Sequence, residues 1–162
     1  MGLDLTLYRI DNKPLVKMTF EEMNEAELAY GRKTWAIADF FSHRCEAIQG
    51  DIIYRVTEDV WDVFMSAIGD LSDSVFRKRI EDFLELDHKI YEIGNATEEE
   101  VSIFEYEYDD INRWLDSVLE TEWGYQLGMT WELHAVVRWY YADSKVRKAF
   151  EDGADVILEK SY

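Results

Sequence analysis

The pattern of hydrophobic and polar residues predicts a long, mostly buried helix over residues 27–48. Apolar side chains recur there at steps of three and four residues, and further apolar positions widen this stripe to most of the helix circumference. Such a helix has to be covered on several sides, so we expect the other elements to wrap around it. Gly31 costs about 1 kcal/mol relative to Ala in a helix interior, which indicates either a close backbone contact or a later helix start. The stripe comprises Tyr30, Thr34, Ile37, Phe41, Cys45 and Ile48, widened by Trp35, Ala36, Phe40 and Ala47.

Shorter elements precede and follow this helix. Alternating apolar and polar residues predict a half-buried strand over residues 3–8, and a second short strand is predicted over residues 52–56. Thr57 has the position of an N-cap for a helix that ends at Gly69. A further helix is predicted over residues 74–93, because apolar residues keep helical spacing along this stretch.

The C-terminal part of the chain has the clearest strand pattern in the sequence. Residues 129–141 alternate between two sets of side chains and predict a strand. The alternative is a helix whose apolar face is formed by Leu133, Val136, Val137 and Tyr140. Asp143 or Ser144 can cap a final short helix, and the tail over residues 154–162 fits either helix or strand.

Acidic residues are concentrated in residues 98–122, which contain ten of them and a single arginine. A capping box formed by Thr97 and Glu100, followed by apolar residues at helical spacing, predicts one helix of about 25 residues. It would carry a row of carboxylates roughly 35 Å long, comparable with one turn of duplex DNA. The alternative is a strand over residues 104–108 followed by a helix over residues 109–122. The row comprises Glu98, Glu105, Asp109, Asp116 and Glu120.

Length and composition favour a single globular domain over residues 1–162. The chain contains 48% hydrophobic and 15% aromatic residues, which suffices for one ordinary core. No internal repeat or low-complexity linker divides it. We therefore predict an α+β domain that is mainly helical and wrapped around the central helix over residues 27–48. It includes a small β-sheet to which residues 3–8 and 129–141 contribute.

The net charge of −18, from 35 acidic and 17 basic residues, argues against several classes of partner. Such a field repels nucleic acids and anionic membranes and attracts basic surfaces. We therefore expect no direct binding of DNA or RNA. The sequence shows no signal peptide and no apolar run near the roughly 18 residues of a membrane span, so we expect a cytoplasmic protein that does not bind membranes.

Motifs for catalysis or cofactor binding are scarce. His43, His88 and His134 lack metal-ligand spacing, and we expect no metal site. The sequence has no Gly-rich phosphate loop, nucleophile elbow or Cys-x-x-Cys motif, so we expect no cofactor. Trp123 and Trp131 lie close to the acidic segment and are candidates for anchoring a partner protein. Nothing in the sequence fixes the oligomeric state.

Two stretches, MGLDLTLYR and ELAYGRKTWAIADFF, resemble the signature of a family of small, mostly uncharacterised tailed-bacteriophage proteins. That family opens with a Gly-Leu-Asp-Met-Tyr-Leu type strand and later carries Glu-Val-Gly-Tyr-Trp-Arg-Lys-Ala-Asn-Ala-Ile-His-x-Trp-Phe. The chain has Gly31 where the family has Trp, Trp35 in place of Asn and Ala38 in place of His, which removes the best polar chemistry of the motif. The resemblance implies a phage origin and an infected bacterial host. The corresponding residues are Asp4, Glu27, Tyr30, Arg32, Lys33 and Ile37.

The sequence supports two functional hypotheses. The first is a phage-encoded inhibitor that binds a host nucleic-acid-binding defence protein, such as a CRISPR effector or restriction enzyme, as a DNA mimic. Its carboxylates would occupy the basic groove that normally takes phosphates. The competing interpretation is that the charge provides solubility alone.

The second hypothesis is a small enzyme or ligand-binding protein. Its pocket would be formed by Asp4, Glu27, Tyr30, Arg32 and Lys33. The competing interpretation is a structural ion-pair cluster that holds the first strand to the central helix.

Overall fold

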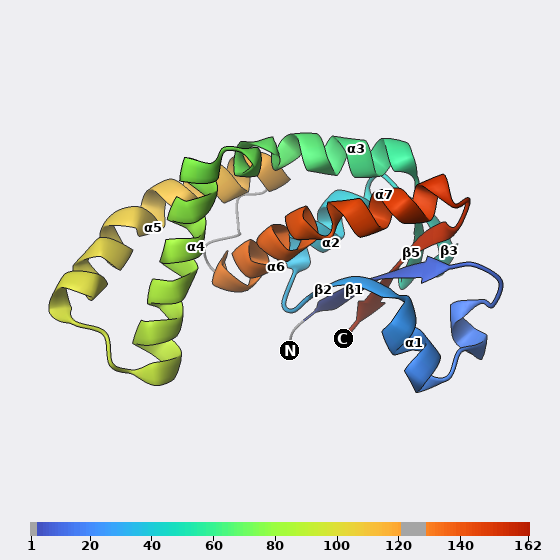
Figure 1. Ribbon diagram of the computed structural model, residues 1–162, viewed down its shortest axis with the longest axis horizontal. Coiled ribbons are helices and arrows are strands. Elements are labelled where there is room, and N and C mark those ends of the chain that lie inside the picture. Colours follow the sequence, from blue (N-terminus) through green and yellow to red (C-terminus); the bar gives the residue numbers. More distant parts are fainter. Residues whose placement is uncertain (1–2, 121–128) are drawn as a thin grey trace.

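A five-stranded antiparallel sheet lies along one side of the molecule in the computed structural model, which describes residues 3–120 and 129–162 (Figure 1). The strand order is β2-β1-β5-β4-β3, so the last strand of the chain lies at the centre of the sheet. The strands are β1 (Asp4–Ile10), β2 (Glu27–Gly31), β3 (Glu46–Gln49), β4 (Ile53–Val56) and β5 (Asp155–Ser161). The predicted strands over residues 3–8 and 52–56 are thereby confirmed.

Most of the chain is helical, and the longer helices fall into two groups (Figure 1). Helices α2, α3, α6 and α7 lie over one face of the sheet, whereas α4 and α5 lie alongside each other and project away from it. The helices are α1 (Phe20–Ala26), α2 (Trp35–Ser42), α3 (Glu58–Ala67), α4 (Ser74–His88), α5 (Glu98–Leu119), α6 (Met129–Tyr141) and α7 (Asp143–Glu151). Two 3-10 turns, η1 (Leu15–Lys17) and η2 (Gly69–Ser72), and a π-helical turn, η3 (Lys89–Ile93), complete the chain. The α+β fold class is confirmed.

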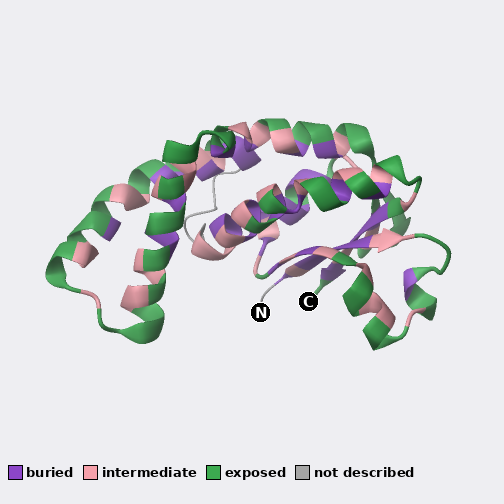
Figure 2. Ribbon diagram, viewed as in Figure 1, coloured by how far each residue is buried: buried purple, intermediate pink, exposed green. Residues whose placement is uncertain are grey.

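The sheet turns one row of apolar side chains toward the helices, as the period of two in a strand requires. In register, Leu7 of β1 lies opposite Ala29 of β2 and Leu158 of β5. These three side chains, like Leu5 two residues earlier, are buried. Figure 2 shows buried residues gathered where this face of the sheet meets the covering helices.

The centre of the core is a cluster of five buried aromatic rings from three helices. The ring of Phe41 lies 5.0–6.4 Å from each of the other four ring centroids. Although α2 is only eight residues long, it therefore holds the middle of the molecule between the sheet, α3 and α6. The cluster comprises Phe40, Phe41, Trp61, Phe64 and Trp139.

The predicted continuous helix over residues 27–48 is wrong. The segment divides into strand β2, helix α2 and strand β3. Residues of β2 pair with β1, and Lys33 has a left-handed backbone (φ 55°) that separates the strand from the helix. Short apolar runs fit both helical and strand periods, so tertiary pairing decided the outcome. Beyond α2, Cys45 is only half-buried and Ile48 is exposed, so the predicted stripe does not continue.

The predicted strand over residues 129–141 is also wrong, and the alternative helix is correct. Leu133, Val136 and Trp139 are fully buried at helical spacing, whereas Trp131 and Val137, which a strand would have placed with Leu133, are only half-buried. Aromatic and β-branched residues raised the strand propensity of this segment. Packing of a wide apolar face against β2 and α2 overrode that propensity.

The acidic segment is one continuous helix, which confirms the helical prediction over the strand alternative. The capping box is formed by Thr97 and Glu100, and α5 ends at Leu119 with Glu120 in a left-handed conformation. Phe104 is buried while Tyr106 is 79% exposed, although a strand would have placed both on one face. The last two residues of the predicted helix lie outside the described residues.

The remaining predicted helices are present. Thr57 caps α3 by accepting a hydrogen bond from the backbone N–H of Val60, and Trp61 and Phe64 form its buried face. Asp73 caps α4, and α7 follows as the final short helix. The tail, for which helix and strand were both open, is the central strand β5.

The close approach of β2 to α6 gives a direct test at Gly31. An alanine Cβ there would lie 2.8 Å from the Cβ of Ala135 and 2.8 Å from the Cγ2 of Thr34, so neighbouring backbone has to move. We expect Gly31→Ala to lower the free energy of unfolding by about 1–3 kcal/mol in urea titrations. Gly69→Ala is the control, because a Cβ at Gly69 meets nothing within 4 Å. Equal stability of the two variants would contradict the close approach.

Candidate functional site

Helices α4 and α5, joined by η3, form a two-helix arm that extends away from the sheet (Figure 1). Aromatic contacts hold its two helices together. Phe83 stacks on Phe104 with ring centroids 4.6 Å apart, and Phe76 meets Trp114 edge to face at 5.0 Å. A regular helix fixed by such contacts presents its outer side chains at defined spacing.

The predicted acidic row follows one side of the arm. At 100° per residue, the four members within α5 fall on one stripe of the helix, about 27 Å long from Glu98 to Asp116, and Glu120 follows at the C-cap. Four of the five members are exposed, and Asp116 is half-buried. The row comprises Glu98, Glu105, Asp109, Asp116 and Glu120.

Ion pairs neutralise many of the other carboxylates around α5. Glu100 pairs with Lys89 at 2.6 Å, Glu107 with Arg79, and Asp110 with Arg113 at 3.1 Å. Within the row itself, Glu120 pairs with Arg44 at 3.0 Å. By contrast, three members make no ion pair with any residue that the structure describes. We call Glu98, Glu105 and Asp109 the unpaired acidic row.

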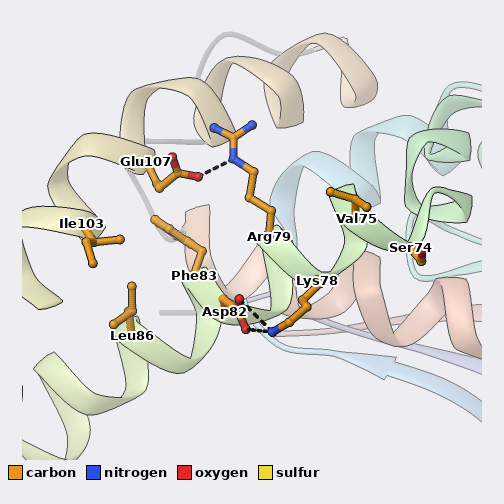
Figure 3. A pocket seen from close by; sticks show the side chains of 9 residues that line it. All are labelled: Ser74, Val75, Lys78, Arg79, Asp82, Phe83, Leu86, Ile103 and Glu107. Atoms are coloured by element: carbon orange, nitrogen blue, oxygen red, sulfur yellow. Dashed lines mark hydrogen bonds and ion pairs between the residues drawn. The ribbon is translucent and has the colours of Figure 1, made fainter.

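A groove between α4 and α5 occupies the other side of the arm (Figure 3). Its volume is about 520 Å³. Glu107 lies on the groove side of α5, and Glu105 and Asp109 are each two residues away from it, so both point to the opposite side of the helix. The two sides of the arm therefore differ in chemistry. The lining consists of Ser74, Val75, Phe83, Leu86 and Ile103 with the ion pairs Lys78–Asp82 and Arg79–Glu107.

Part of the alternative pocket does come together, at the edge of the sheet. The Tyr30 hydroxyl donates a hydrogen bond to Asp4 Oδ2 at 2.8 Å, and the backbone N–H of Lys33 donates to Asp4 Oδ1 at 3.3 Å. Burial and the nearby Asp4 carboxylate raise the pKa of Tyr30. Glu27 lies at the exposed start of β2 and takes no part in these bonds. The cluster thus ties β1 to the loop after β2, rather than to a central helix.

The two cations of that pocket contact a tryptophan. The Arg32 guanidinium carbon lies 5.2 Å and the Lys33 ammonium nitrogen 5.3 Å from the ring centroid of Trp131, within the range of cation–π attraction. The structure therefore places Trp131 with the second predicted site. Trp123, the other proposed anchor, lies outside the described residues.

Sequence reasoning missed a buried carboxylate at the start of α2. Glu132 on α6 is 3% exposed, and its Oε1 accepts a hydrogen bond from the backbone N–H of Ala36 at 2.7 Å, with Ile37 N–H 3.4 Å from Oε2. Burial raises its pKa to about 8, and the two N–H groups offset part of that effect. Thr34 provides no side-chain cap for α2, so Glu132 acts as its cap from another helix.

Other classes of site find no support in the described part of the chain. No group of three or more His, Cys, Asp or Glu side chains is placed to hold a metal ion among the described residues. Within residues 3–120 and 129–162, no helix has both the length and the apolar character needed to cross a bilayer.

Comparison with models of known protein families, with curated proteins and with solved structures returns no significant match. The phage-family resemblance therefore stays a prediction.

Proposed function

We propose that the protein binds a partner protein through the unpaired acidic row, and that the partner is a nucleic-acid-binding protein with a basic groove. The observation that carries this proposal is the contrast along α5 between carboxylates engaged in ion pairs and the three exposed members of the acidic row that are not. Following the sequence resemblance, we propose a phage inhibitor of a bacterial defence protein, acting in the cytoplasm of the infected cell.

Three physical features support this proposal. First, Glu105 and Asp109 are four residues apart, a like-charge spacing that costs a few tenths of a kcal/mol and so does not serve helix stability. Second, the arm holds these carboxylates on a regular helix, which limits the entropy lost on binding. Third, carboxylates in a Lys/Arg groove can replace phosphates without any reading of bases.

Neutralising the unpaired acidic row provides the test. We expect Glu98→Gln, Glu105→Gln and Asp109→Asn together to slow association with the partner about tenfold at low salt and to flatten its salt dependence. The fold should be retained, because relief of the Glu105–Asp109 repulsion offsets the loss of Glu98 from the helix N-terminus. The control variant neutralises Glu25, Glu46 and Glu151, which are exposed and make no ion pair in the described structure.

The measurement begins with immobilised protein and lysate of a bacterial host. Captured proteins should be released by added duplex DNA, and the retained partner should then be used for stopped-flow association at several salt concentrations. The control variant should behave as the parent chain. Equal association rates and equal salt slopes for the two variants would contradict the proposal, as would capture that duplex DNA does not displace.

A further inference from the structure

Most basic side chains of this acidic protein form ion pairs with carboxylates. Of 17 lysines and arginines, 11 form ion pairs, and all 17 lie in the described ranges. With 35 acidic residues available, a basic side chain that lacks such a pair is the exception. Six lack one within the described structure: Lys17, Arg32, Lys33, Arg55, Arg138 and Lys145.

Three of these six side chains gather at one place beside the edge of the sheet. Arg32 and Lys33 lie over the ring of Trp131. Arg138 lies on the same face of α6 as Trp131, because the two are seven residues apart. Arg32 and Arg138 are both close enough to the Tyr30 hydroxyl to lower its pKa, against the larger effect of burial. We call Arg32, Lys33 and Arg138 the cationic patch.

The loop that carries Arg32 and Lys33 is held in a fixed conformation. Lys33 has a left-handed backbone, which is strained for a residue other than glycine. Two hydrogen bonds hold this strained backbone in place. The Lys33 N–H donates to Asp4, and the Thr34 N–H donates to the carbonyl of Leu3 at 2.8 Å. The preceding Gly31 is packed against Ala135 of α6. The two cations are therefore pre-positioned above α6, so little ordering remains to be done on binding.

The local charge balance is positive in spite of the overall negative charge. Among the described residues, the carboxylate that is hydrogen-bonded to this loop is Asp4, and its oxygens are already engaged by Tyr30 and Lys33. Glu132, close by on α6, is buried, and its raised pKa favours the uncharged form at pH 7. The long-range field of the protein is screened within about 8 Å at physiological ionic strength, so the near charges dominate for a small ligand.

We propose that the cationic patch, with the Tyr30 hydroxyl and the Trp131 indole at its rim, binds the phosphate group of a small phosphorylated molecule. Guanidinium groups match the oxygens of a phosphate in bidentate geometry, and a lysine ammonium adds a mobile third donor. A phosphate dianion needs more than one cation to offset its desolvation. The cationic patch supplies three cations that form no ion pair with a carboxylate of the described structure. The site is separate from the arm and does not depend on the function proposed for it.

The test uses two probes, inorganic pyrophosphate and glycerol 3-phosphate, titrated into the full chain at constant ionic strength maintained with chloride. The indole N–H signals of a nitrogen-15-labelled sample are followed, and the signal of Trp131 is assigned with Trp131→Phe. We expect a saturable shift of the Trp131 signal with both probes and no comparable shift for the buried Trp61. A response to pyrophosphate alone would narrow the ligand to an inorganic polyphosphate.

Matched variants decide whether the patch is responsible. Arg32→Gln with Lys33→Gln should weaken binding about tenfold or more. Arg55→Gln with Lys145→Gln removes the same charge from unpaired cations elsewhere and should leave the affinity within about twofold. Arg138→Gln provides a second test should the first variant fail to fold. The proposal would be overturned if the Trp131 signal showed no saturable shift, or if chloride alone shifted it as much as the phosphate probes do. It would also be overturned if Arg55→Gln with Lys145→Gln weakened binding as much as Arg32→Gln with Lys33→Gln.

Discussion

Replacing Phe41 with alanine is expected to lower the free energy of unfolding by about 3–5 kcal/mol, the usual cost of deleting a fully buried aromatic ring. The ring is 0% exposed and lies against Trp61, Phe64 and Trp139, which come from two other helices. Because these large neighbours are themselves fixed by the sheet and by each other, they have little room to collapse into the cavity.

Trp35, six residues earlier in the same helix, is the matched control. It is half-buried, and its ring contact is with Tyr162, at 6.1 Å between centroids. Trp35→Ala should therefore cost clearly less than Phe41→Ala, although Trp is the larger residue. Urea titrations of both variants supply the measurement. Equal losses would mean that the centre of the core does not lie at Phe41.

The contrast between Trp35 and Phe41 shows what the pattern of apolar residues can and cannot predict. The pattern placed both on one buried stripe, because apolar spacing reports that a side chain is suited to a core but not which element covers it. Helices α3 and α5 were predictable because Thr57 and Thr97 mark their starts through local cap chemistry, and α4 was predictable from the helical spacing of its apolar residues. The cap chemistry depends on residues three positions apart and needs no tertiary information.

The segments predicted wrongly are those whose structure depends on distant parts of the chain. Strand β2 forms because β1 pairs with it, and the alternating segment before Tyr141 becomes α6 because its wide apolar face packs against β2 and α2. Neither partner can be read from the local period. An error of this kind changes which side chains share a face: Leu133 and Trp139 stay buried, but Val136 joins them in place of Val137.

The same distinction between local and distant contacts applies to the candidate sites. The acidic row was predictable because it depends on periodicity within one helix. The contact of Arg32 and Lys33 with Trp131, and the cap that Glu132 provides for α2, join residues nearly a hundred positions apart. Glu132 was missed because the strand prediction placed it on the polar side of the segment. No signal for this cap was present in the sequence, because Thr34 is itself a favoured N-cap residue type and only the structure shows that its hydroxyl donates to the Leu3 carbonyl instead.

The buried carboxylate of Glu132 leads to the second large effect, a loss of stability as the pH rises. In the unfolded chain a glutamate deprotonates near pH 4.5, whereas burial raises the pKa of Glu132 in the folded protein to about 8. Between these values the folded state holds a proton that the unfolded state has released. Stability therefore falls with rising pH, by up to about 1.4 kcal/mol per pH unit, and the fall levels off above the folded pKa.

Glu132→Gln separates this effect from all other titrating groups. The amide keeps the shape and an acceptor for the Ala36 N–H but carries no titrating proton. The difference in unfolding free energy between the parent chain and the variant should be small near pH 5 and should grow by several kcal/mol in favour of the variant toward pH 8.5. Exposed groups with shifted pKa values, such as Glu22 and Asp152, cancel in this difference because both proteins contain them. Parallel stability curves across this pH range would show that Glu132 is already ionised in the fold, with the α2 N-terminus supplying enough compensation to hold a buried charge.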